Sequence, residues 1–417
     1  MIFQNNRGFD HPPAERCLLW KGSIDMDLFQ KCVDFTQADE YREKGIFPYF
    51  RELQSRQDTE VIMEGKRRIM LGSNNYLGLT TDPDVVEAGL KALRDFGTGC
   101  SGSRLLNGTL QLHNELEAEL ASFLGKEAVC TLPTGFQTNL GIISALVGRN
   151  DYVLCDRDNH ASIYDGCKLS YGRMLRYKHN DMDELEQRLK SVPSTAGILI
   201  VTDGVFSMGA DLCNLPAICD LAEKYGARVM VDDAHALGVI GKGGRGTASH
   251  FGLEDRVDIY MGTFSKSLAS LGGYCAASRR VVDFIMTNSR PFMFAASIPP
   301  ASCAVALTAL RKLEAHPEMV DHLRHLADYL RSGLVARGMR IREGITPIVP
   351  IFMHDAESTL IKVTELYEAG VYVNSVLPPA APADGCMLRC SLMATHTEAL
   401  LDEAMDIMGK VIGEYHE

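Results

Sequence analysis

The feature that most constrains the fold of this chain is a regular alternation between residues 128 and 277. Short apolar runs alternate there with segments whose apolar residues recur at helical spacing. Strands that are apolar along their whole length are buried on both faces, and strands that alternate with helices join into a parallel sheet. The alternation therefore predicts an α/β fold, with a mostly parallel sheet and helices on both faces. The strand-like runs are 128–132, 152–155, 197–202, 228–232, 259–261 and 273–277.

Polar residues follow several of these runs, at the point where each predicted strand ends. His160 follows the second run, Asp203 and Ser207 follow the third, Asp232 and His235 close the fourth, and Lys266 follows the fifth. In open α/β sheets, ligands bind outside the carboxyl ends of the strands. The sequence therefore predicts a binding site at this edge of the sheet.

The regions outside the alternation differ in character. We expect residues 1–70 to form an N-terminal arm, with a helical segment at 35–51 and two short strands at 59–63 and 67–71. Residues 71–300 are the predicted large α/β domain. Residues 301–417 are a predicted smaller α+β domain, in which long helical patterns flank short strands at 348–352 and 387–391.

Composition argues against several classes of function. The net charge of -12 over 417 residues argues against nucleic acid as a partner, because phosphate binding needs clustered Lys and Arg. No apolar run approaches the roughly 18 residues that a membrane span needs, and we expect a cytoplasmic protein. The cysteines lack zinc-ligand spacing, so we expect no metal site. The glycine-rich motif at 97–102 follows a helical pattern rather than a strand, which argues against a dinucleotide site.

Lys266 lies between two hydroxyl residues in a turn after a predicted strand. A lone lysine in such a turn is most often a solvated surface residue, but an amine in this setting can also form a Schiff base with an aldehyde cofactor. Such a cofactor also needs an anion beside its pyridine nitrogen, a cup for its phosphate and a flat partner for its ring. Residues that could fill these four roles are, in order, Lys266, Asp232, the group Gly135, Phe136, Thr263 and Ser265, and His160. Asp232 and Asp233 are adjacent on a strand and point to opposite faces, so only one can meet the ring.

From about residue 45 to its C-terminus, the chain resembles the α-oxoamine synthase family of fold-type I pyridoxal-phosphate enzymes. The motifs that carry the resemblance include Thr-Gly-Phe at 134–136, Asp-Asp-Ala-His at 232–235 and Gly-Thr-Phe-Ser-Lys-Ser at 262–267. Further matching segments are 75–78, 99–108, 160–166, 203–208 and 388–391. The resemblance implies a fold-type I transferase with a seven-stranded, mostly parallel sheet and pyridoxal 5'-phosphate (PLP) as cofactor.

The resemblance also implies a role for each candidate residue. Lys266 would hold the cofactor, Asp232 would pair with its pyridinium nitrogen, His235 would contact its phenolic oxygen and His160 would stack on its ring. The remaining cofactor-binding candidates are Gly135, Phe136, Ser207, Thr263 and Ser265, and the substrate-binding candidates are Asn75 and Arg389. The chain departs from the family pattern at Phe136, Ala236 and Ala295, where tyrosine, serine and a partner-reaching hydroxyl residue are common.

Thr-Phe-Ser-Lys-Ser resembles the branch of the family that condenses L-serine with a long-chain acyl-CoA such as palmitoyl-CoA. The products implied are 3-ketodihydrosphingosine, CoA and CO2. The same resemblance implies a homodimer, with peripheral membrane contact for product release. The alternatives are a sibling synthase that uses glycine or alanine and a non-catalytic partner subunit. Lys266 argues against the latter, because a scaffold subunit needs no Schiff-base amine. A serine hydrolase is disfavoured because the motif Gly-x-Ser-x-Gly does not occur.

Overall fold

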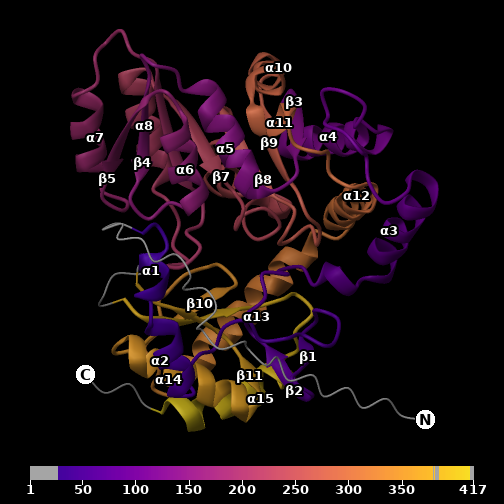
Figure 1. The fold of residues 1–417 in the computed structure, drawn as a ribbon, viewed down its shortest axis with the longest axis vertical. Coiled ribbons are helices and arrows are strands. Elements are labelled where there is room, and N and C mark those ends of the chain that lie inside the picture. The colour runs from indigo at the N-terminus through magenta and orange to yellow at the C-terminus, as the bar shows by residue number, and fades with distance from the viewer. Residues whose placement is uncertain (1–26, 379, 381–384, 414–417) are drawn as a thin grey trace. The chain divides into compact units, whose positions relative to one another are not determined.

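A seven-stranded sheet lies at the centre of the region between residues 128 and 277 (Figure 1). Every strand is parallel to its neighbours except β9, which is antiparallel to both β3 and β8. This sheet confirms the predicted seven-stranded, mostly parallel α/β fold. In order across the sheet, the strands are β3 (Ala128–Leu132), β9 (Gly273–Ala277), β8 (Ile259–Thr263), β7 (Arg228–Asp232), β6 (Ile198–Asp203), β4 (Tyr152–Asp156) and β5 (Arg173–Tyr177).

Helices cover both faces of the sheet because the side chains of each strand alternate between two apolar layers. Val153 and Cys155 of β4 belong to one hydrophobic cluster, whereas Leu154 between them belongs to the other. The first cluster includes α5 (Gly135–Leu146), α6 (Ala161–Leu169), α10 (Arg279–Asn288) and α11 (Arg290–Met293). The second includes α3 (Pro83–Phe96), α4 (Gln111–Leu124), α7 (Met182–Lys190), α8 (Leu215–Tyr225), α9 (Thr247–Phe251) and α12 (Pro300–Ala315).

The parallel strands bring the polar residues at their carboxyl ends to one edge. Asp203 at the end of β6 lies opposite Asp232 at the end of β7, and Asp232 lies opposite Met261 of β8. The motif at 97–102 lies in the loop between α3 and α4, so it follows a helix as predicted.

Outside residues 128–277, the chain forms two smaller sheets of three strands each. One is antiparallel and consists of β10 (Ile348–Phe352), β13 (Met387–Ser391) and β12 (Asn374–Val376). The other joins the hairpin of β1 (Glu60–Met63) and β2 (Lys66–Met70) to β11 (Val371–Tyr372). A shared apolar core links β2, β10, β11 and β13 to α13 (Glu318–Ala336), α14 (Ala356–Ala369) and α15 (Glu398–Ile412).

The computed structural model describes residues 27–378, 380 and 385–413, and the chain divides after Phe47 into two units. The first unit contains α1 (Gln30–Val33) and α2 (Gln37–Glu43). The predicted helix over 35–51 is therefore wrong in its length. Gly45 adopts a positive φ of 71° and Pro48 follows, and neither conformation continues a helix.

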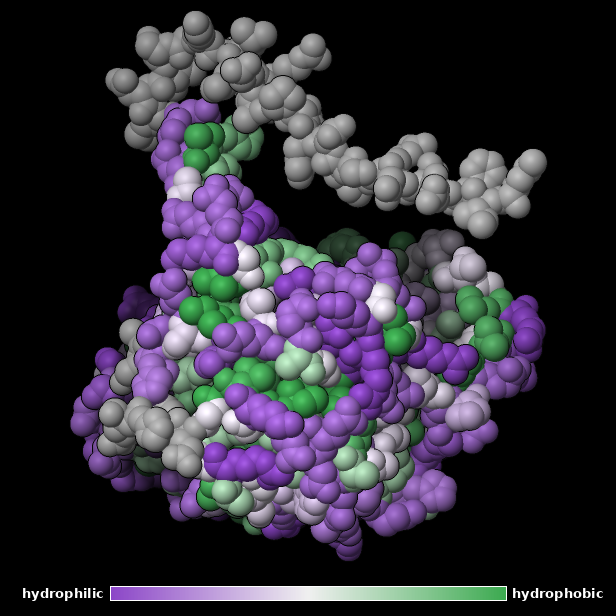
Figure 2. Space-filling model, turned by 90° about the horizontal axis from the view of Figure 1, so that it is seen from below, coloured by the Kyte–Doolittle hydropathy of each residue, from purple (hydrophilic) through white to green (hydrophobic). Residues whose placement is uncertain are grey.

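None of the helices in the described part of the chain combines the length and the apolar character that a membrane crossing requires. On the face seen in Figure 2, hydrophilic residues cover most of the surface, and hydrophobic residues form smaller groups between them.

Candidate active site

A cavity of about 250 Å³ at the carboxyl edge of the sheet brings the predicted cofactor-binding residues together. All of them line it: Gly135, Phe136, His160, Ser207, Asp232, His235, Thr263, Ser265 and Lys266. They come from the ends of β4, β6, β7 and β8 and from the start of α5. The lining also includes Asn139, Ser162 and Asp203, to which the sequence analysis gave no role in the site.

Lys266 lies in the loop that follows β8, beside two carboxylates. Burial lowers the pKa of its amine to about 8, although the negative charges of Asp232 and Asp203 act in the opposite direction. A larger share of the amine is therefore unprotonated near neutral pH than in an exposed lysine. The loop is held in place by Thr263, whose hydroxyl donates to the carbonyl of Gly272 (2.9 Å) and accepts from the backbone N–H of Ser265 (3.3 Å).

Asp232 is buried, and both of its carboxylate oxygens accept hydrogen bonds. The Asn139 amide donates to Oδ2 (2.7 Å) and the backbone N–H of Ala234 donates to Oδ1 (2.9 Å). The adjacent Asp233 does not line the cavity and accepts from the backbone N–H of Thr247 (3.0 Å). Burial raises the pKa of Asp233 to about 7. Only one of the two aspartates therefore faces the cavity, as the alternation of side chains along a strand requires.

His160 caps the N-terminus of α6 at the rim of the cavity. Its Nδ1 accepts from the backbone N–H of Ser162 (3.2 Å), so the proton of the neutral ring is on Nε2. Burial and the charge of Lys266 lower the pKa of His160, against the opposite effect of Asp232. The ring of Phe136 meets that of His160 edge to face, with the centroids 6.3 Å apart.

Asp203 is a buried carboxyl group that the sequence placed at a strand end without a role. Its Oδ2 accepts from the backbone N–H of His160 (3.0 Å), whereas its Oδ1 has no hydrogen-bond partner among the described residues. Burial and the neighbouring Asp232 raise the pKa of Asp203 well above its usual range, more than Lys266 lowers it. A carboxyl group in this state can be protonated and donate a hydrogen bond into the cavity.

Arg389 on β13 is a buried guanidinium held by several acceptors next to the cavity. Its Nε donates to the carbonyl of Ser207 (2.6 Å), Nη1 to Asn74 Oδ1 (3.1 Å) and Ser391 Oγ (2.6 Å), and Nη2 to the Tyr76 hydroxyl (3.3 Å). Among the described residues, these bonds leave one N–H of Nη2 for a further acceptor.

Asn75, the other predicted substrate residue, lies elsewhere. Its amide donates to Thr80 Oγ1 (2.7 Å) and to the sulfur of Met393 (3.5 Å), and it does not line the cavity. Its neighbours Asn74 and Tyr76 are the residues that contact Arg389. The sequence predicted a polar loop here but had no periodic pattern that would indicate which amide faces the site.

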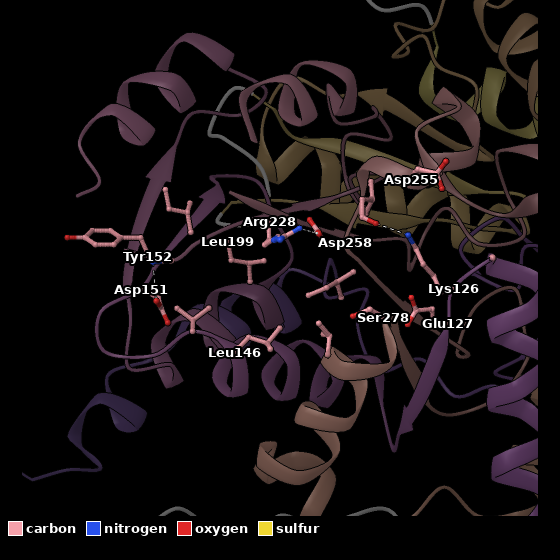
Figure 3. A pocket seen from close by; sticks show the side chains of 17 residues that line it. Lys126, Glu127, Leu146, Asp151, Tyr152, Leu199, Arg228, Asp255, Asp258 and Ser278 are labelled. Carbon is pink, nitrogen blue, oxygen red and sulfur yellow. Dashed lines mark hydrogen bonds and ion pairs between the residues drawn. The ribbon is translucent and has the colours of Figure 1, made fainter. Parts of the chain in front are cut away.

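A larger cavity of about 720 Å³ lies at the opposite edge of the sheet (Figure 3). It is lined by Tyr152, Ile198 and Arg228, which are the first residues of their strands. The two cationic side chains that line it, Lys126 and Arg228, already bind acceptors of the protein. Arg228 pairs with Asp258 (2.8 Å), and Lys126 donates to the backbone carbonyls of Glu254 (2.9 Å) and Val257 (2.7 Å). We therefore place the chemistry at the smaller cavity, which holds Lys266 and the carboxyl groups of Asp203 and Asp232.

The smaller cavity fits PLP in its chemistry. It offers an amine, a carboxylate, an imidazole and hydroxyl groups on one surface. The start of α5 offers backbone N–H groups to a phosphate. Gly135 is required there, because a Cβ at this position would lie 2.8 Å from the Cβ of Thr263.

Comparisons with known proteins agree with this geometry. A family model described as aminotransferase class I and II matches residues 66–408. The serine palmitoyltransferase of Sphingobacterium spiritivorum is 50% identical over 384 residues, which cover 92% of this chain and 96% of that protein. The 8-amino-7-oxononanoate synthase of Geobacter sulfurreducens is 43% identical over 378 residues, which cover 90% of this chain and 96% of that protein. A high-resolution structure of serine palmitoyltransferase with PLP as internal aldimine is 38% identical with a TM-score of 0.90, covering 93% of this chain and 98% of that one.

Proposed function

The chain belongs to the aminotransferase class I and II family, and from that premise we propose that it condenses L-serine with a long-chain acyl-CoA such as palmitoyl-CoA. The products are 3-ketodihydrosphingosine, CoA and CO2, which makes the protein a PLP-dependent acyltransferase. The observation that carries the proposal is the single cavity that contains Lys266, Asp232, His160 and His235. The predicted resemblance to α-oxoamine synthases is confirmed by 50% identity to a serine palmitoyltransferase.

The residues that would hold the cofactor follow from the lining of the cavity. PLP, when bound, supplies an electron sink for a carbanion at the amino-acid Cα. Lys266 would bind its aldehyde carbon, and Asp232 would hold the proton on its ring nitrogen. Its phosphate or ring would contact Gly135, Phe136, Thr263 and Ser265. Its ring face would stack on His160, and its phenolic oxygen would lie near His235 and Ser207.

The chain's own groups would then move the protons. Once the amine of serine has replaced Lys266 at the aldehyde carbon, the freed amine of Lys266 would take the Cα proton of serine, because its depressed pKa of about 8 leaves a useful fraction of free amine near neutral pH. The remaining N–H of Arg389 binds the serine carboxylate, with charge assistance. The Nε2–H of His160 orients the thioester carbonyl of the acyl-CoA. The Cα of serine would then bond to the thioester carbonyl carbon, and the C–S bond would break to release CoA as a thiolate that takes a proton from solvent. Loss of the carboxylate as CO2 and return of the proton from Lys266 to Cα would complete the reaction.

The test is a substrate panel combined with two lysine variants. Purified protein is assayed for CoA release and CO2 formation with serine, glycine and alanine, each with acetyl-CoA and palmitoyl-CoA. We expect serine with palmitoyl-CoA to be fastest. Lys266→Ala should abolish turnover, whereas Lys126→Ala, at the opposite edge of the sheet, should retain it.

A different ranking of the substrates by rate would favour the sibling synthase that uses glycine or alanine. Faster condensation with glycine or alanine, or equal rates with both acyl-CoAs, would assign the chain to that activity, which the 43% identity to 8-amino-7-oxononanoate synthase also supports. Full activity of Lys266→Ala would overturn the proposal.

We propose further that the protein is a cytoplasmic homodimer that contacts a membrane peripherally when its long-chain product leaves. The segment 292–300 resembles the one that reaches the phosphate site of the partner subunit in this family. It lies against the family-matching segment 99–108, since the backbone N–H of Ser297 donates to the carbonyl of Gly102 (3.0 Å). We also propose a division into an arm at 1–70, a PLP-binding domain at 71–300 and a C-terminal domain at 301–417. The seven-stranded sheet lies within the second range and the β10-β13-β12 sheet within the third, whereas the remaining sheet joins β2 of the arm to β11.

A further inference from the structure

Tyr76 is a fully buried tyrosine whose hydroxyl lies between the cofactor side and the substrate side of the site. The hydroxyl is 2.7 Å from His235 Nδ1, 3.3 Å from Arg389 Nη2 and 3.2 Å from Asn74 Oδ1. His235 lines the cavity, whereas Tyr76 does not. Tyr76 can therefore act only through the residues that it binds.

The donors and acceptors around this hydroxyl determine where its proton lies. Arg389 Nη2 can only donate, so the Tyr76 oxygen accepts from it. The single proton of Tyr76 then has two acceptors, His235 Nδ1 and Asn74 Oδ1. The His235 contact is shorter by half an ångström, and Asn74 Oδ1 already accepts from Arg389 Nη1 (3.1 Å). The shorter contact favours donation from Tyr76 to an unprotonated His235 Nδ1 over donation to Asn74.

Donation from Tyr76 would fix the tautomer of His235. With Nδ1 as the acceptor, the proton of the neutral imidazole is on Nε2. The neutral form is favoured, since burial and the charges of Lys266, Arg389 and His160 lower the pKa of His235 well below its usual range. His235 thus offers a hydrogen-bond donor, rather than an acceptor, at Nε2.

We propose that Tyr76 is a positioning residue that sets the Nε2–H tautomer of His235 and couples it to the occupancy of Arg389. This inference rests on the proposed function, in which Arg389 binds the amino-acid carboxylate. The positive charge of Arg389 polarises the Tyr76 hydroxyl and strengthens its donation to His235. A carboxylate bound to Arg389 offsets that charge and so changes the hydrogen bond on His235. Because such coupling is reciprocal, the tautomer and protonation state of His235 must in turn change the affinity of Arg389 for the amino-acid carboxylate.

The test compares Tyr76→Phe with Tyr274→Phe in the PLP-bound protein. Tyr274 is also fully buried, but its hydroxyl has no hydrogen-bond partner among the described residues, so its loss should be silent. With ¹⁵N-labelled histidine, the His235 signals are identified by their disappearance in His235→Gln. We expect the Nε2–H tautomer in the parent protein and in Tyr274→Phe, and a mixture of tautomers in Tyr76→Phe. An Nδ1–H tautomer in the parent, or no change in Tyr76→Phe, would overturn the proposal.

A second measurement separates this proposal from the choice of substrate. Spectral titration of the bound cofactor gives the dissociation constants of serine, glycine and alanine, which share the same carboxylate. Tyr76→Phe should weaken all three by about fivefold, because Arg389 loses one acceptor that orients it. Equal weakening together with a preference for glycine would contradict the proposed substrate but support the contact between Tyr76 and Arg389 on which the coupling depends. Unchanged constants for all three would contradict the coupling whichever substrate turns over.

Discussion

The pKa of Lys266 shows how burial and charge oppose each other at a single residue. Two carboxyl groups nearby favour the ammonium form, yet burial outweighs them and the pKa falls to about 8. Burial also raises the pKa of Asp203, together with the charge of Asp232, and Lys266 only partly opposes them. When Asp203 is protonated, only the charge of Asp232 favours the ammonium form of Lys266. The site therefore keeps a reactive amine beside Asp232, whose hydrogen bonds from Asn139 and Ala234 fix its orientation.

The two adjacent aspartates allow a matched test of the role proposed for Asp232. Asp232→Asn should retain bound cofactor but lower the condensation rate by at least about a hundredfold, because a neutral amide does not hold the pyridinium proton. Asp233→Asn should keep nearly full activity, since Asp233 lies on the other face of the strand. The measurements are the visible absorbance of the bound cofactor and the rate of CoA release. A large loss in Asp233→Asn with an active Asp232→Asn would exchange their roles.

At the residue scale, the sequence could predict the lining of the cavity but not every contact. Residues such as Asp232 and Lys266 follow buried strands, so their position at the edge depends only on the strand pattern. Asn139 could have been found as a polar residue within the apolar pattern of α5. Tyr76 and Asn74 could not, because they lie in the irregular loop at 72–78, where turn geometry rather than periodicity decides which side chain faces the site.

At the scale of elements, burial explains which strands the sequence predicts. The central strands are buried on both faces and appear as continuous apolar runs. β5 lies at the edge of the sheet and was not predicted, because Arg173 and Arg176 are exposed and interrupt its apolar pattern. Charged residues on an edge strand also discourage pairing with a second sheet.

His179, in the loop after β5, connects the end of β4 to the loop after β6. Its Nδ1 is 3.1 Å from Asp156 and its Nε2 is 2.6 Å from Asp211, which also pairs with Arg342 (3.0 Å). Burial lowers the pKa of His179, but hydrogen bonds and charges from both aspartates outweigh it and raise the pKa to about 10. Since this is above the unfolded value, the stabilisation is complete below about pH 6.5 and is lost as the pH rises towards 10.

His179→Gln should therefore lower the free energy of unfolding by roughly 2 kcal/mol at pH 6, and by progressively less towards pH 10. Thermal or urea unfolding across this pH range measures the difference. The control is His316→Gln, since His316 pairs with Glu318 at 3.1 Å on the exposed surface, and we expect a change below about 0.5 kcal/mol. A destabilisation in His179→Gln that does not depend on pH would show that the charge of His179 is not responsible.

At the scale of the whole molecule, exposed apolar side chains lie on the segment 292–300, which is proposed to reach a partner subunit, and on the adjacent segment 99–108. Leu106 and Phe294 are 77% and 75% exposed in the single chain. Their segments are joined by the Ser297–Gly102 hydrogen bond and by the thiol of Cys100, which donates to the carbonyl of Ile298 (3.4 Å). Burying one such side chain in an interface contributes about 2 kcal/mol. A second copy of the chain is the partner that we expect to cover them.

Leu106→Asp and Phe294→Asp should therefore shift the protein from the mass of two chains towards one, as light scattering would measure. The condensation rate should fall with the loss of the dimer, because the resemblance to fold-type I enzymes implies a site at the subunit interface. Leu169→Asp is the matched control, since Leu169 is 63% exposed at the end of α6, outside both segments, and should leave mass and rate unchanged. A parent protein that is active as a monomer would remove the dimer from the proposal. Activity that survives in monomeric Leu106→Asp would instead place the complete site within one chain.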